Sequence, residues 1–102
     1  MSSGFIGVLS FDVHFPHERS LKGKRKYLLS LKSDLQRNVG ASVAEVDYHD
    51  LWQRTRLTAA VVDVSVSTLA DRLDRCERIV IDHGLDASSV ERVIVTPEEI
   101  AS

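Results

Sequence analysis

The sequence predicts an α+β fold in which strands and helices follow the order strand, helix, strand, strand, helix, strand. Four segments alternate apolar and polar residues, which is typical of strands, and two segments carry apolar residues at helical spacing. The chain has 102 residues, 43% of them hydrophobic and 27% charged, which is the profile of one globular domain. We expect a single domain over residues 1–102, with a core from about residue 5 to residue 96 and short disordered ends.

The first strand is predicted over residues 5–15, where apolar and polar positions alternate until Pro16 removes a backbone donor. One face is expected to be buried and carries Phe5, Gly7, Leu9, Phe11, Val13 and Phe15. The other face carries Ile6, Val8, Ser10, Asp12 and His14.

The first helix is predicted to begin after Ser20, whose hydroxyl can accept a bond from a free backbone N–H of the first turn. Leucines at positions 21, 28, 31 and 35 form its buried stripe, and Gly40 stops it after about Asn38. Gly23 is a weak point, because glycine inside a helix costs about 1 kcal/mol relative to alanine.

Two further strands are predicted over residues 41–48 and 54–64, and their short connection favours antiparallel pairing. A second helix follows, capped by Ser65 or Ser67 and ended by Gly84, with Leu69, Leu73, Cys76 and Val80 on its inward side. The last strand covers residues 89–96 and leads into a short tail.

This order is that of a ferredoxin-like βαββαβ sandwich, a four-stranded antiparallel sheet with two helices on one face. Right-handed crossovers place the first and third strands at the centre of the sheet. The other face of the sheet is then open, and open faces of this fold commonly bind RNA, a ligand or a second copy.

Composition excludes several classes of protein. The net charge is −2, so overall charge predicts neither a nucleic-acid binder nor a membrane-surface protein. Cys76 is the single cysteine, which fits a reducing compartment. No apolar run approaches the roughly 20 residues that span a bilayer. The N-terminus lacks the features of a signal peptide. We expect a cytoplasmic protein without a membrane partner.

Positive charge is concentrated at the start of the first helix, where cations oppose the helix dipole. Taking the leucine stripe as the buried direction, Lys22 and Lys26 point sideways, while Lys24 and Arg25 flank the stripe. We weigh an anion or RNA site against a solvated basic face. The candidate anion-binding residues are Arg19, Lys22, Lys24, Arg25, Lys26, Arg54 and Arg56.

Stacking of RNA bases on the sheet is not expected. The predicted third strand has no aromatic residue, and the phenylalanines of the first strand share its buried face. Any RNA contact is therefore predicted to be led by phosphate groups, with little sequence specificity.

Polar residues of the first two strands form a second, weaker candidate site. Carboxylate and imidazole groups together can hold a metal or transfer protons. The spacing matches no metal signature, and a solvated sheet face is the simpler interpretation. The candidates are Asp12, His14, Glu45, Asp47 and His49.

A third candidate is a protein interface. Trp52 either covers the end of the hairpin or forms a hot spot beside Leu51. Ile6 and Val8 on the open face favour self-association, so a homodimer is expected.

Enzyme is the weakest class. The sequence contains no nucleophile elbow, phosphate-binding loop, dinucleotide fingerprint or zinc spacing, and we predict no cofactor and no metal. Three hypotheses stand in order: an RNA-binding module, a homodimeric interaction module, and a small anionic-ligand binder or enzyme.

Four motifs resemble the bacterial YlxP-like family, the domain of unknown function 503. They are FDVHFP at 11–16, RSLKGKR at 19–25, SVAEV at 42–46 and DLWQR at 50–54. The resemblance covers about residues 6–95 and implies a cytoplasmic ferredoxin-like protein with no established activity. The genes of the family often lie near genes of translation initiation and ribosome-binding factors, which implies a translation-related role in which RNA or the ribosome is the partner. Gly23 stands where the family usually has a polar residue, so a reciprocal capping box is absent. The match is poor from Glu91 onward.

Overall fold

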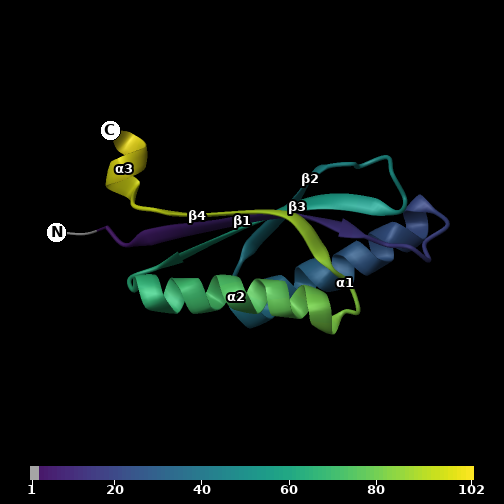
Figure 1. The fold of residues 1–102 in the computed structure, drawn as a ribbon, viewed down its shortest axis with the longest axis horizontal. Helices are drawn as coiled ribbons and strands as arrows, with labels where there is room; N and C mark the ends of the chain where they lie inside the picture. The colour runs from purple at the N-terminus through teal and green to yellow at the C-terminus, as the bar shows by residue number, and fades with distance from the viewer. Residues whose placement is uncertain (1–2) are drawn as a thin grey trace.

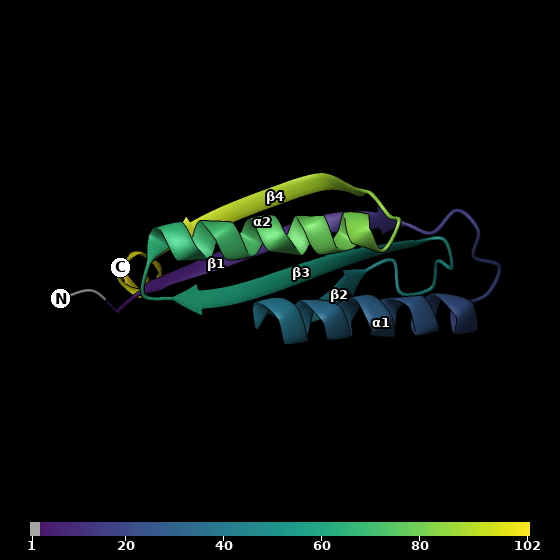
Figure 2. The same cartoon turned by 90° about the horizontal axis from the view of Figure 1, so that it is seen from below.

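The computed structural model describes residues 3–102 and shows a four-stranded antiparallel sheet covered on one face by two helices (Figures 1 and 2). The elements are β1 (Phe5–His14), α1 (Leu21–Val39), β2 (Ser42–Asp47), β3 (Arg54–Asp63), α2 (Val66–Asp82), β4 (Ala87–Val95) and α3 (Pro97–Ala101). The strand order is β2-β3-β1-β4, so the prediction that the first and third strands are central is confirmed.

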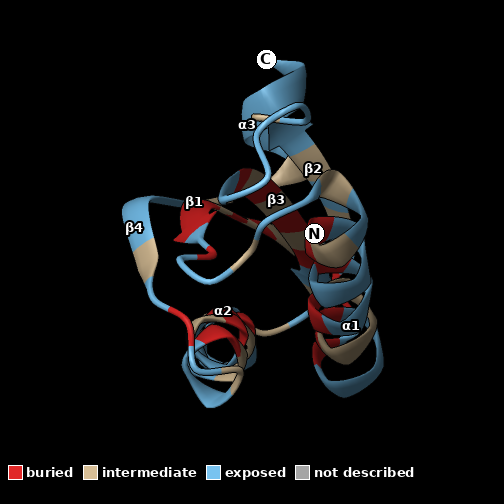
Figure 3. Cartoon of the chain, turned by 90° about the vertical axis from the view of Figure 1, so that its right-hand side faces the viewer, coloured by how far each residue is buried: buried red, intermediate tan, exposed pale blue. Residues whose placement is uncertain are grey.

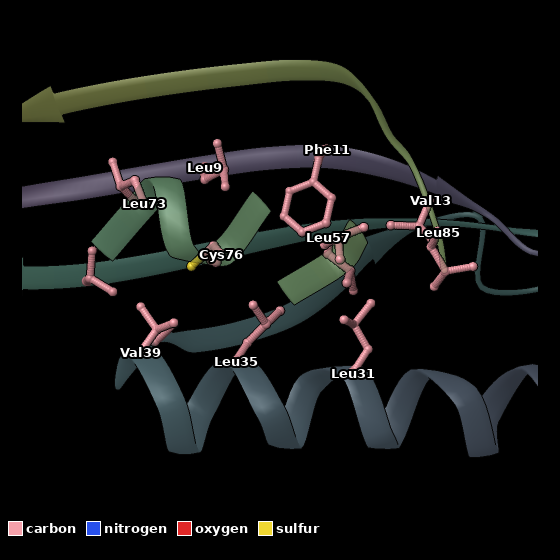
Figure 4. Packing of buried hydrophobic residues seen from close by; sticks show 14 of the residues in the cluster. Leu9, Phe11, Val13, Leu31, Leu35, Val39, Leu57, Leu73, Cys76 and Leu85 are labelled. Atoms are coloured by element: carbon pink, nitrogen blue, oxygen red, sulfur yellow. The ribbon is translucent and has the colours of Figure 1, made fainter. Parts of the chain in front are cut away.

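The core lies between the sheet and the helices, where Figure 3 shows the buried residues. Phe11 and Val13 of β1 point toward Leu31 and Leu35 of α1 in the close view of Figure 4. Gly7 allows close packing of the sheet against α2, because a Cβ there would lie 3.0 Å from the side chain of Leu73 and that side chain would have to shift. The predicted buried face of the first strand is therefore confirmed.

Both ends of α1 follow the predicted caps. The hydroxyl of Ser20 accepts a hydrogen bond from the backbone N–H of Gly23 at 3.0 Å. Gly40 ends the helix in the left-handed conformation, with φ of 70°. The guanidinium of Arg72 on α2 donates to the carbonyl oxygen of Val39 at 2.6 Å and 3.0 Å, which ties the end of α1 to the second helix. In α2, Ser65 rather than Ser67 is the cap.

The C-terminal region differs from the prediction in two places. Strand β4 begins at Ala87 and contains a bulge, since Ser10 pairs with Glu91 while Asp12 pairs with Ser88. Ser89 lies in that bulge with φ of 49°. The segment expected to be a short tail forms α3, because Thr96 and Glu99 build a reciprocal capping box there. Figure 1 shows α3 on the side of the sheet opposite to α1 and α2.

Candidate functional site

The open face of the sheet has an apolar end. Ile6 of β1 pairs with Val62 of β3 and with Val95 of β4, and the next outward pairs join Val8 to Ala60 and Val93. Val62 and Val93 are 64% and 51% exposed. The apolar patch of the open face is thus Ile6, Val8, Ala60, Val62, Val93 and Val95.

The other end of the open face is polar and centres on Asp12. One carboxylate oxygen of Asp12 accepts from Arg54 at 2.7 Å, and the other accepts from Arg56 at 2.8 Å. Arg56 also reaches Glu91 at 2.9 Å and the carbonyl oxygen of Ser89 at 3.2 Å. These residues form the Asp12 cluster, whose central carboxylate belongs to a residue only 4% exposed.

The electrostatics of the Asp12 cluster favour the ionised carboxylate. Burial raises the pKa of Asp12, but the hydrogen bonds and charges of Arg54 and Arg56 outweigh it, so the pKa lies below its ordinary value. Arg54 also lies over the ring of Tyr48, with its guanidinium carbon 4.2 Å from the ring centroid. Two of the predicted anion-binding residues are therefore already paired with acids.

Lys24 is not part of the exposed basic surface, which corrects the sequence prediction. It is 1% exposed and its ammonium group lies 2.9 Å from a carboxylate oxygen of Glu45. The same ammonium donates to the carbonyl oxygen of Tyr48 at 2.6 Å. Thr55 donates its hydroxyl to Glu45 at 2.5 Å, which completes the Lys24–Glu45 pair and its partners.

Glu45 lies on the face of the sheet that the helices cover, which corrects its predicted place on the open face. It pairs across the strands with Leu57, whose side chain is in the core. Burial raises the pKa of Glu45, but Thr55 and Lys24 lower it by more, so the net shift is downward. The sequence contains a sign of this arrangement, because Lys24 precedes Leu28 and Leu31 at the spacing of the buried stripe.

The predicted polar cluster of the open face is only partly assembled. Asp12 and His14 share the open face, and Asp47 lies opposite Arg56 in the backbone pairing of β2 with β3. His49 lies in the β2–β3 loop, where its ring is 3.2 Å from the carbonyl oxygen of Glu45. Within residues 3–102, no group of three or more histidine, cysteine or acidic residues is placed to hold a metal ion.

Four of the predicted anion-binding residues remain free. Their side chains are exposed and make no ion pair or hydrogen bond with any part of the chain that the structure describes. They surround the first turns of α1. Among the predicted anion-binding residues, positive charge without an acidic partner is therefore found only in this region. These four free cations are Arg19, Lys22, Arg25 and Lys26.

The predicted interface residues form two separate surfaces. Ile6 and Val8 lie at the start of β1, whereas Leu51 and Trp52 precede β3, whose first residue pairs with the last residue of β1. The two pairs are therefore separated by most of the length of a ten-residue strand, roughly 25 Å or more. Trp52 is 50% exposed and lines a hollow beside Arg19.

Cys76 belongs to none of these candidate sites. It is buried in the core, and burial raises the pKa of its thiol to about 11, so the reactive thiolate is suppressed.

No helix in residues 3–102 combines the length and the apolar character needed to cross a membrane.

Known structures share the fold at low sequence identity. Protein YJCS, from structural genomics, has a TM-score of 0.56 and 8% identity over 86% of this chain and 96% of its own. A ferredoxin-like protein of unknown function from Bacteroides fragilis, described as dimeric, has a TM-score of 0.50 and 9% identity over 94% of this chain and 99% of its own.

A dimeric ferredoxin-like protein from an uncultured marine organism has a TM-score of 0.50 and 12% identity, covering 94% of this chain and 88% of its own. These structures confirm the predicted ferredoxin-like fold. No curated protein matches the sequence.

The family is shown by the sequence itself. The model described as protein of unknown function (DUF503) matches residues 6–93, which includes every motif on which the resemblance depended. The match ends two residues before β4 does, in the region where the resemblance was poor. The chain therefore belongs to the DUF503 family of proteins of unknown function.

Proposed function

We propose that this chain is a homodimeric interaction module in which two copies pack through the apolar patch of their open sheet faces. The observation that carries this proposal is the patch itself. Its residues from β1, β3 and β4 form one continuous apolar surface, and Val62 and Val93 are more than half exposed. An exposed contiguous apolar surface of this kind is typical of a protein interface.

A second copy fits the patch better than a polar partner does. Two sheets can pack face to face with their apolar side chains interdigitating, and a two-fold interface needs a surface that is complementary to itself. An apolar patch meets this condition, while the charges of the neighbouring Asp12 cluster are already compensated within one copy. Two solved structures with this fold, at 9% and 12% identity, are described as dimeric, which supports a dimer here.

Sedimentation of the full chain tests the dimer. We expect the wild-type chain to sediment as a dimer at micromolar concentration, and the double variant Val62→Lys, Val93→Lys to sediment as a monomer. Both side chains are exposed, so the variant is expected to keep its far-UV circular dichroism spectrum. Leu29→Lys on the outer side of α1 is the matched control, since it is also exposed and must leave the dimer intact. A monomeric wild-type chain at high concentration contradicts the proposal.

Nucleic-acid binding is a second candidate, favoured by the four free cations at the start of α1. A contact to RNA through Arg19, Lys22, Arg25 and Lys26 would weaken as the salt concentration rises, because counterions are released on binding. The connection with translation or the ribosome depends on the family resemblance alone. A cytoplasmic location likewise stays a prediction from the single cysteine. Nothing in residues 3–102 adds support for a small-ligand or enzymatic role.

Binding of structured RNA across a salt series tests this candidate. We expect alanine at Lys22 and Arg25 to weaken binding and to reduce the salt dependence by about one charge per residue. Lys32→Ala, farther along the same helix, is the charge-matched control. The absence of any salt-dependent affinity contradicts this candidate.

A further inference from the structure

We propose that the hollow beside Trp52 binds single-stranded nucleic acid, with a base stacked on the indole ring and phosphates held by the free cations. The inference rests on the nucleic-acid candidate above and names its ligand class. The hollow has a volume of about 470 Å³. It is lined by Pro16, His17, Glu18, Arg19, Trp52 and Gln53.

The two loops that form the hollow are fastened to each other. The backbone N–H of Phe15 donates to the carbonyl oxygen of Gln53 at 2.7 Å, and the side-chain amide of Gln53 donates to the carbonyl oxygen of Glu18 at 3.3 Å. At the other end of the β2–β3 loop, the carbonyl oxygen of Tyr48 accepts from both the N–H of Leu51 and the buried Lys24. Trp52 is therefore presented from a braced loop, with half of its surface in solvent.

The lining of the hollow carries one positive and one negative side chain, Arg19 and Glu18, and the excess of positive charge lies beside the hollow. Lys22, Arg25 and Lys26 follow Arg19 at the start of α1 without acidic partners. Glu18 is the one acidic residue among those that line the hollow, and its carboxylate lies against the Cα of Gly23 on α1. An anionic ligand is therefore the complementary one.

A single strand matches this combination better than an acidic protein or a duplex does. It alternates phosphates with bases whose flat faces are free, and such bases stack on tryptophan with little dependence on sequence. In a duplex the bases already stack on one another, so no free base face is available to stack on the indole ring. An acidic peptide would use the cations but has no flat ring at regular intervals.

Trp52 is the only tryptophan of the chain, so its fluorescence reports stacking directly. Three ligands are titrated into the wild-type chain: a 12-nucleotide uridine or adenosine strand, a 12-base-pair RNA duplex, and inorganic polyphosphate. We expect the single strand to quench the fluorescence and to bind at least tenfold more tightly than the duplex. Polyphosphate is expected to bind weakly and to leave the fluorescence nearly unchanged.

Variants separate stacking from charge, with affinity measured by the anisotropy of a labelled strand. We expect Trp52→Ala to lose about tenfold in affinity for the single strand, the lower part of the range for one stacked base. Trp52→Phe, which keeps an aromatic face, is expected to recover part of that loss. Leu51→Ala is the control for truncation of an exposed residue in the same loop.

The outcomes distinguish this inference from the nucleic-acid candidate on which it rests. If Trp52→Ala binds the single strand as tightly as the wild type, or if duplex and single strand bind equally, stacking is overturned while nucleic-acid binding stands. Equal quenching by polyphosphate also overturns it. If no polyanion binds at 50 mM salt, both proposals fail together.

Discussion

The two faces of the sheet each carry an ion-pair cluster, and the clusters differ in exposure. On the helix-covered face, Lys24 and Glu45 are enclosed with Thr55. On the open face, Asp12 is buried, its partner Arg56 is mostly covered, and its partner Arg54 extends to the surface. The same chemistry therefore holds a helix onto the sheet on one face and leaves the guanidinium of Arg54 at the surface on the other.

Breaking the enclosed pair is expected to have the largest effect. Lys24→Ala leaves the carboxylate of Glu45 in a covered site without its cation, which costs about 3–5 kcal/mol of the free energy of unfolding. Urea denaturation followed by circular dichroism measures this loss. Lys26→Ala, an exposed lysine two residues along, is expected to stay within about 0.5 kcal/mol of the wild type.

A double substitution tests removal of both charges of the Lys24–Glu45 pair. Lys24→Met with Glu45→Gln removes both charges together, and we expect it to recover much of the stability that Lys24→Ala loses. Equal losses in the single and double variants would mean that the charged contacts of Lys24, rather than the packing of its stem, hold α1 to β2, because methionine keeps an apolar chain at this position.

The Asp12 cluster is expected to contribute less. Asp12→Ala removes the shared acceptor of two guanidinium groups, and we expect a loss of about 2 kcal/mol in the free energy of unfolding. Glu91→Ala, which removes an exposed acid from the rim of the same cluster, is expected to change stability by less than about 0.5 kcal/mol. If Asp12→Ala proves as costly as Lys24→Ala, the two faces do not differ in the way described.

Acid is expected to weaken both clusters. The pKa values of Asp12 and Glu45 are lowered in the folded chain, so their contribution is present above about pH 4 and is lost as the pH falls through the folded values. We expect the free energy of unfolding to fall below about pH 4 by up to 1.4 kcal/mol per pH unit for each group. Asp12→Asn is expected to flatten this decline, and an unchanged decline contradicts the role of Asp12.

Substitution of Gly23, one residue before Lys24, is expected to change the free energy of unfolding least. Gly23→Ala places a methyl group where the mobile end of the Glu18 side chain now lies, and that side chain can move into solvent. We expect a gain of up to about 1 kcal/mol from helix propensity, measured by the urea midpoint. Gly40→Ala is the contrasting control, since its φ of 70° makes any side chain unfavourable there.

The fold could be predicted because each element is marked by local chemistry. Alternation marks β1 and β3, while Ser20 and Gly40 mark the two ends of α1. The burial of Lys24 was missed because a charge at a stripe position is normally counted as surface, and only its pairing with Glu45 shows otherwise. That pairing joins α1 to β2 and depends on the three-dimensional fold.

The candidate surfaces could be predicted only in part. The free cations at the start of α1 and the apolar residues of β1 follow from the sequence, but their neighbours do not. Trp52 lies beside Arg19 because two loops far apart in the sequence meet at the end of the sheet. A short tail is predicted from the sequence where α3 lies, because a helix of five residues is too short to show an apolar period, and its one signal is the capping box of Thr96 and Glu99.

The bulge at Ser89 affects how strand β4 can pair with a strand of another chain. Strand β4 is an edge strand of the sheet. A straight edge strand would offer an unbroken row of backbone donors and acceptors for pairing with a strand of another chain. The bulge interrupts that row and increases the local twist, so the border is a poor template for continuous, fibril-like growth. The bulge therefore disfavours edge-to-edge association through β4, which agrees with the proposed face-to-face dimer.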